Sequence, residues 1–187
     1  MMGRRTGLKE RDLQMHAETY RQENDLLLKI CFEMPACYEA ANGMYEPESQ
    51  TLFINQAKLE NAPAYETLFY LYHELRHAVQ YQKPDHFEAM IVRSLDYVVG
   101  HDGKCWKRIN KTWKACRLAG SESYFTQMYL AQPNESDANA FAFQTVKEIL
   151  GNSEALQALY SFWKPVEEVS AEQYNDLYRQ IDRLTET

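Results

Sequence analysis

Apolar side chains recur at helical spacing between Ala64 and Gln82, and this stretch has the clearest pattern in the chain. One arc of the expected helix carries Leu68, Leu71, Leu75, Ala78 and Val79. The opposite arc carries His73 and His77, which lie one turn apart. The pattern therefore predicts a helix over residues 64–82 that is buried on both sides and stops at Lys83-Pro84.

Weaker patterns predict the elements around this helix. A first helix is expected over Gly7–Cys31, ended by Pro35. Two short strand-like runs separated by turn residues fall within Cys37–Gln56, and Thr51–Ile54 is the stronger of them. Further helices are expected at Ser121–Ala131, Asn134–Leu150, Glu154–Trp163 and Ala171–Leu184.

The segment from Asp85 to Leu118 is ambiguous. Residues 87–95 fit a short helix, residues 97–99 fit a strand, and residues 109–118 fit either. No repeat, low-complexity run or linker divides the chain, so we expect a single domain over residues 1–187. Its predicted class is α+β, with a small antiparallel sheet beside the 64–82 helix and a mainly helical C-terminal half.

Composition narrows the function. The net charge of −7 and the pI near 5.3 argue against a nucleic-acid partner, because no basic surplus is present to neutralise phosphates. The one basic stretch, residues 104–114 with Trp106 and Trp113, is interpreted as a solvated face, and its role stays open. The sequence has no run of 18 apolar residues and no apolar N-terminal segment. Four cysteines without Cys-x-x-Cys spacing favour reduced thiols, so we expect a cytoplasmic protein without a membrane partner.

The chemistry-bearing motif is His73-Glu74-Leu75-Arg76-His77. Two imidazoles one helical turn apart can bind one metal ion, and Glu74, about 100° round the helix, can reach a water molecule there without being a ligand. His16, His86 and His101 lack such spacing and are not expected to bind the metal.

A third ligand is sought in the helix over Asn134–Leu150. Its expected inward arc contains Ala138, Ala142, Val146 and Ile149, and Glu135 falls on that arc. A carboxylate at the head of an apolar face needs a partner or a metal, although a first-turn acidic residue can also simply complement the helix dipole. Asp137 points to the opposite side, so Glu135 is the predicted ligand.

These two motifs, His73-Glu74-x-x-His77 and Glu135-Ser-Asp-Ala-Asn139-Ala-Phe-Ala, resemble the minimal gluzincin metallopeptidases of the ImmA/IrrE type, over roughly residues 36–150. The resemblance implies a zincin-like fold, a Zn²⁺ ion held by His73, His77 and Glu135, and Glu74 as general base. It also implies Asn139 as the acceptor that orients a ligand histidine. Such proteins often occur on phages and mobile elements.

The expected function is hydrolysis of peptide bonds in a protein or peptide substrate, with zinc-bound water activated by Glu74. Candidates for oxyanion stabilisation are Tyr70, Tyr81, Tyr124, Tyr129 and His101, and the sequence does not choose among them. The alternatives are a metal-binding regulatory module of zincin fold without turnover, and a structural helical protein with a coincidental motif. The sequence leaves the substrate and the oligomeric state open.

Overall fold

The computed structural model describes residues 8–186. Residues 1–7 lie outside the described residues. The predicted start of the first helix at Gly7 falls there, as does part of the N-terminus in which no apolar segment is expected. The chain divides into two compact units: one runs to Lys83 and includes Ala138–Phe162, and the other comprises Pro84–Asp137 and the residues from Trp163 onward. The predicted mixed α+β class is confirmed, and the single domain over residues 1–187 stays a prediction.

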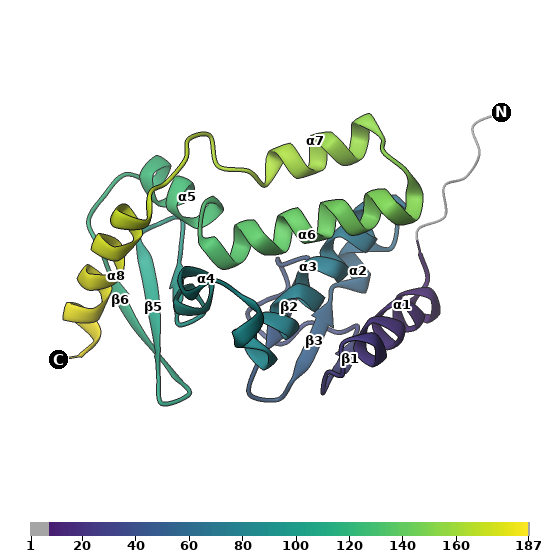
Figure 1. Cartoon of the computed structure of the whole chain (residues 1–187), viewed down its shortest axis with the longest axis horizontal. Helices are drawn as coiled ribbons and strands as arrows, with labels where there is room; N and C mark the ends of the chain where they lie inside the picture. The colour runs from purple at the N-terminus through teal and green to yellow at the C-terminus, as the bar shows by residue number, and fades with distance from the viewer. Residues whose placement is uncertain (1–7, 187) are drawn as a thin grey trace. The chain divides into compact units, whose positions relative to one another are not determined.

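The first unit contains a three-stranded sheet of order β1-β3-β2 (Figure 1). Its strands are β1 (Lys29–Cys31), β2 (Gly43–Glu46) and β3 (Thr51–Ile54). β2 and β3 pair antiparallel, whereas β1 pairs parallel to β3. The prediction of an antiparallel sheet is therefore wrong for β1. The chain reverses direction once between β1 and β2 and again between β2 and β3, so β1 and β3 run the same way.

The first helix is shorter than predicted. Helix α1 spans Glu10–Glu23, and its C-cap Asn24 donates from Nδ2 to the Tyr20 carbonyl at 2.9 Å. Asp25 follows in the left-handed region, with φ 48°, which cannot continue a helix. The chain then extends into β1, so Pro35 does not terminate this helix.

The predicted helix over residues 64–82 is confirmed as α3, Ala64–Gln82, with Pro63 as N-cap. It follows the short helix α2 (Gln56–Leu59) and contacts both β2 and β3. All five residues of its predicted apolar arc are buried. Tyr72 and Glu74 are also buried, which confirms burial on more than one side.

Two C-terminal helices complete the first unit. Helix α6 spans Pro133–Leu150, with its residues from Ala138 onward in this unit, and α7 spans Glu154–Phe162. The inward arc of α6 buries Ala138, Ala142 and Val146, as predicted. Ile149 is 42% exposed, so its predicted place on the buried arc is wrong, because the last turn of α6 extends past the packed part of the helix.

The second unit contains a three-stranded antiparallel sheet of order β4-β5-β6. Its strands are β4 (Tyr97–Val99), β5 (Lys104–Ile109) and β6 (Thr112–Arg117). Its helices are the 3₁₀ turn η1 (Pro84–His86), α4 (Ala89–Ser94), α5 (Glu122–Leu130) and α8 (Ala171–Thr185). The open choice for residues 109–118 is settled as a strand, and the Ser170/Gln173 capping box of α8 is present.

The core of this unit lies between the sheet and its helices. Tyr97 of β4 stacks on Tyr178 of α8, with ring centroids 4.0 Å apart. The cluster is completed by Val99, Cys105, Phe125, Met128, Tyr174, Leu177 and Ile181. Figure 1 shows α8 alongside β5 and β6, which it contacts.

The basic stretch of residues 104–114 forms much of the β5–β6 hairpin. The Nζ atom of Lys107 lies 2.7 Å from Asp182 and 2.8 Å from Glu186, both on or next to α8. Burial lowers the pKa of Lys107, but the hydrogen bonds that its ammonium donates to these two carboxylates outweigh burial, and the net shift of the pKa is upward. Lys114 Nζ donates to the Thr185 carbonyl. The interpretation of the stretch as a solvated face is therefore wrong for Lys107, whose side chain is 15% exposed, whereas Lys114 is exposed, as expected.

Two cysteines that are eleven positions apart in the chain lie opposite each other in the sheet. Cys105 of β5 is the register partner of Cys116 of β6, and both are free thiols, as are Cys31 and Cys37. Burial is the main cause that raises the pKa of Cys105 to about 11. This thiol is thus held protonated.

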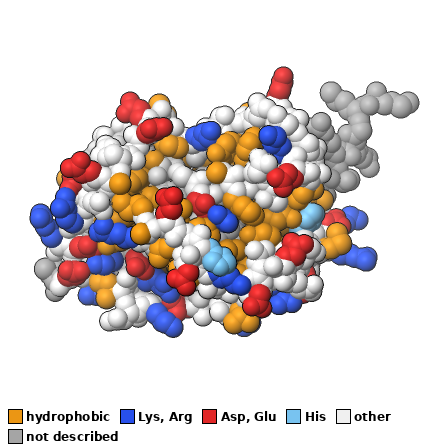
Figure 2. All heavy atoms as spheres, viewed as in Figure 1, with side chains coloured by type: hydrophobic (Ala, Val, Ile, Leu, Met, Phe, Trp, Pro, Cys, Tyr) orange, Lys and Arg blue, Asp and Glu red, His pale blue; other side chains and the backbone are white. Residues whose placement is uncertain are grey.

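Within residues 8–186, no helix combines the length and the apolar character that a bilayer crossing requires. On the face of the molecule seen in Figure 2, acidic and basic side chains are interspersed rather than gathered by sign.

Candidate metal centre

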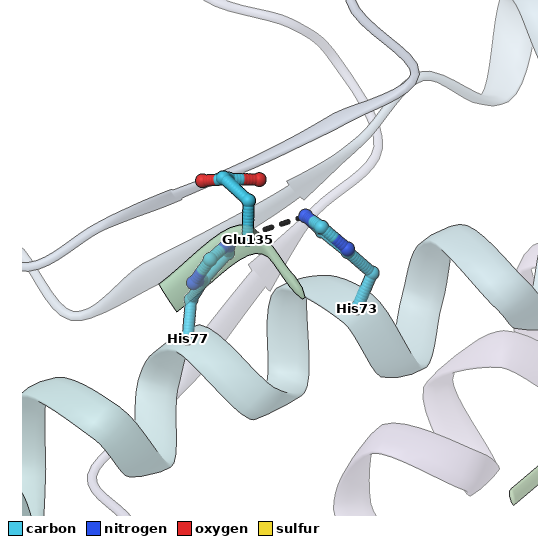
Figure 3. Close-up of side chains that lie close together, drawn as sticks. All are labelled: His73, His77 and Glu135. Atoms are coloured by element: carbon cyan, nitrogen blue, oxygen red, sulfur yellow. Dashed lines mark hydrogen bonds between the residues drawn. The ribbon is translucent and has the colours of Figure 1, made fainter. Parts of the chain in front are cut away.

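His73 and His77 project from one side of α3 (Figure 3). Their Nε2 atoms lie 3.1 Å apart and their ring centroids 4.7 Å apart, with the ring planes almost perpendicular. The i, i+4 spacing on a straight helix produces this approach, as the motif predicts. His77 is buried, and His73 is half-buried.

Glu135 lies beside the two imidazoles (Figure 3). It belongs to the first turn of α6, and one carboxylate oxygen accepts a hydrogen bond from Asn134 Nδ2 at 3.1 Å. One ligand atom from each of His73, His77 and Glu135 lies within 4.8 Å of the other two. Among residues 8–186, this is the group of His, Cys and acidic side chains close enough together to hold a metal ion.

Glu74 is buried, with 7% of its surface exposed, and faces the sheet. It lies against the first residue of β2, where a Cβ added to Gly43 would be 2.8 Å from Glu74 Cγ and 3.2 Å from Oε1. Only a residue without a side chain leaves this room. The absence of a side chain at Gly43 therefore makes space for the predicted general base.

The imidazole of His77 has a hydrogen-bond partner on its own helix. His77 Nδ1 lies 2.8 Å from Oε1 of Gln80, and the Gln80 side chain is fully buried. An amide oxygen only accepts hydrogen bonds, so the proton of this contact is on His77 Nδ1. In neutral imidazole, that leaves Nε2 with its lone pair directed at His73 Nε2.

Asp137 and Asn139 lie two and four residues after Glu135 on α6. Asn139 is buried, with 5% of its surface exposed, and Asp137 is half-buried and outside the three-ligand group. The role of Asn139 as acceptor for a ligand histidine stays a prediction.

The other histidines are also outside this group. His16 Nδ1 lies 3.0 Å from the hydroxyl of Tyr72, and burial is the main cause that lowers the pKa of His16. His86 is exposed, and His101 is hydrogen-bonded to Thr126 Oγ1 at 3.0 Å. His16 and His101 thus have hydrogen-bond partners that are not part of the three-ligand group.

Two of the tyrosines proposed as oxyanion donors are packed in the first unit. Tyr70 meets Phe69 edge-on, with ring centroids 5.8 Å apart, and Tyr81 lies against Tyr45 at 5.9 Å. In the second unit, Tyr124 contacts Phe125 and Tyr129 contacts the His101 ring.

Sequence reasoning missed Gly43, Gln80 and Asn134. A buried glutamine three residues after the second motif histidine is a signal that helical spacing could have found, because i and i+3 side chains meet. Asn134 directly precedes the predicted ligand Glu135 in the chain, so the sequence alone could have indicated it as well. Gly43 carried no such signal, because its contact with Glu74 depends on how β2 packs against α3.

Searches against known proteins add no relative: no family model, no curated protein and no solved structure matches this chain.

Proposed function

We propose that this chain is a zinc-dependent peptidase of zincin-like fold, with His73, His77 and Glu135 as metal ligands and Glu74 as general base. The observation that carries the proposal is the approach of Glu135, which lies 58 residues after His77 in the chain, to the paired Nε2 atoms of the His-Glu-x-x-His helix.

The donor set fits zinc. Two imidazole nitrogens at tetrahedral positions, each about 2.0–2.1 Å from one zinc ion, lie about 3.3 Å apart. The observed separation of 3.1 Å is close to that value. The Glu135 carboxylate completes a set of two neutral ligands and one anionic ligand, which is typical of catalytic zinc sites. When bound, the metal would supply a Lewis acid and lower the pKa of a water molecule.

The residues of the chain supply the remaining steps. Glu74 accepts a proton from the water that attacks the peptide carbonyl and passes it to the leaving amine. Its burial beside β2 keeps the carboxylate in one position and limits competing water.

The strand that is suited to an extended peptide is β2. Thr51–Ile54, the stronger strand of the sequence pattern, has no free edge for a peptide, because β3 is the central strand and pairs on both sides. β2 is an outer strand and begins next to Glu74. A peptide that adds to β2 would pass close to the general base.

Metal analysis combined with turnover tests the proposal. Protein purified without chelator and loaded with zinc is expected to retain one zinc per chain, and His73→Ala to retain almost none. Glu74→Gln is expected to retain the metal and to lose nearly all hydrolysis of a peptide library, because Glu74 is not a ligand.

Each alternative has its own outcome. Zinc retention without any hydrolysis by the wild type would favour the metal-binding regulatory module. Equal zinc content in the wild type and His73→Ala would leave only a coincidental motif in a structural protein. The cytoplasmic location and the association with mobile elements stay predictions.

A further inference from the structure

Gln80 is a buried polar side chain at a position that the two motifs do not include. It is fully buried on α3, three residues after His77, and its Oε1 atom accepts a hydrogen bond from His77 Nδ1 at 2.8 Å. Burying an amide is costly unless it is hydrogen-bonded, so an apolar residue here would be the simpler choice for packing. The amide thus has a use that packing alone does not explain.

The geometry points to Gln80 as a positioning residue for the metal centre: its amide oxygen selects the His77 tautomer in which the Nε2 lone pair can bind a metal. Imidazole can carry its proton on either nitrogen, and only the Nδ1-protonated form has the Nε2 lone pair that faces His73. The inference rests on the proposed metal site.

The contact also fixes the orientation of the ring. His77 is held between Gln80 at Nδ1 and His73 at Nε2, so rotation about its Cβ–Cγ bond breaks one contact or both. Because Gln80 is on the same helix three residues later, the alignment depends on α3 alone. The proposed role of Asn139 on α6 is independent of it.

The matched control is Gln82, two residues further along α3. Its amide donates to the Leu27 carbonyl and the Tyr45 hydroxyl and accepts from Leu27 N–H, so it joins α3 to its surroundings away from His77. Gln82→Leu therefore removes a glutamine of the same helix without touching the metal centre. Gln80→Leu removes the acceptor at similar volume, and Gln80→Glu keeps an acceptor.

The first measurement needs no metal. Long-range ¹H–¹⁵N NMR of the metal-free protein reports which nitrogen of His77 carries the proton. We expect the Nδ1-protonated tautomer in the wild type, Gln80→Glu and Gln82→Leu, and a mixed or Nε2-protonated population in Gln80→Leu. An Nε2-protonated His77 in the wild type overturns the inference.

The second measurement is the zinc dissociation constant by competition with a chromophoric chelator. Gln80→Leu is expected to bind zinc roughly 10–100-fold more weakly than the wild type, and Gln80→Glu to recover most of the loss. Gln82→Leu should bind as the wild type does. Equal affinity of Gln80→Leu and the wild type, or equal weakening in both leucine variants, overturns the inference. If His77 shows the expected tautomers and the wild type binds no zinc, the proposed function fails and the positioning role toward His77 stands.

Discussion

The side chain of Glu74, the predicted general base, packs directly against Gly43. A Cβ atom at position 43 would lie only 2.8 Å from Glu74 Cγ. A contact this short cannot accommodate a methyl group unless β2 or the Glu74 side chain moves. A substitution at Gly43 in β2 therefore tests whether the sheet holds Glu74 in the position that the proposed chemistry needs.

Gly43→Ala is expected to lower the free energy of unfolding by about 1–3 kcal/mol through overpacking. It should also displace the Glu74 carboxylate and reduce peptide hydrolysis, while zinc content stays at the wild-type level. Urea unfolding, metal analysis and a peptide assay measure the three effects.

Gly151→Ala is the control for this variant. Gly151 has φ 83°, so an alanine is strained there, but nothing lies within 4 Å of the added Cβ. It should lose stability without losing hydrolysis beyond the unfolded fraction. Unchanged hydrolysis in folded Gly43→Ala would separate Gly43 from the position of Glu74.

The acidic residues of α6 give the second prediction. Glu135→Ala removes the proposed anionic ligand and should abolish zinc retention, whereas Asp137→Ala should leave the zinc dissociation constant nearly unchanged. Asn139→Ala should weaken zinc binding by roughly 10–100-fold if its amide orients a ligand histidine. Chelator competition compares the three variants, and zinc loss in Asp137→Ala would show that the ligand assignment is wrong.

The outer edge of β2 gives the third prediction. The Asn55 N–H donates to the Asn42 carbonyl, so this pair of residues is hydrogen-bonded between the strands. Hydrogen-bonded and non-hydrogen-bonded pairs alternate along an antiparallel ladder, so the backbone groups of Gly43 and Tyr45 point away from β3. In Glu74→Gln, a bound peptide that extends the sheet should protect the Gly43 and Tyr45 amides from hydrogen exchange.

The neighbouring amides are the internal control. Met44 and Glu46 already face β3, so their exchange should change little when peptide is added. Protection of β1 amides instead, with none at β2, would place the peptide on the opposite edge of the sheet.

The buried thiol of the second unit gives the fourth prediction. The pKa of Cys105 is raised to about 11 from an ordinary value of 9.0, mainly by burial. A raised pKa in the folded state means that the stabilisation from the neutral thiol is complete below about pH 9 and is lost as the pH rises through about 11. The loss amounts to at most about 3 kcal/mol.

Cys105→Ala cannot titrate, so the difference in unfolding free energy between the wild type and this variant should shrink from pH 8 to pH 11. Urea unfolding at both pH values measures it. Cys37→Ala, which removes an exposed thiol and keeps Cys105, is the control substitution.

The pattern of residues 64–82 is enough to predict α3 and its buried arc, because the signal is local and recurs over about three turns, from Leu68 to Val79. The phase of Glu135 on α6 was likewise readable from the sequence, and the structure brings it close to His73 and His77. Both predictions depend on the geometry of a single helix.

Predictions that depended on strand pairing were less complete. Asn110 and Lys111 form the turn with φ of 50° and 64°. An Asn-Gly pair is the usual sequence signal for this kind of hairpin turn, and a lysine at the second position gives no such signal. The β5–β6 hairpin was therefore not recognised. The sequence pattern assigns the residues of β1 to the end of the first helix. It therefore does not predict a strand on the second side of β3, and the central position of β3 does not follow from it.

Helix α6 carries Glu135 seven residues before Ala142 on one unbroken run of turns. A single residue inserted between them would rotate Glu135 by about 100° relative to the buried Ala142 and Val146 face and carry it about 1.5 Å along the axis. An insertion of seven residues would restore the angle to within about 20° but would move the carboxylate by about 10 Å. This part of the helix is therefore intolerant of any change in length, whatever its composition, and insertions should be found before Pro133 or after Leu150.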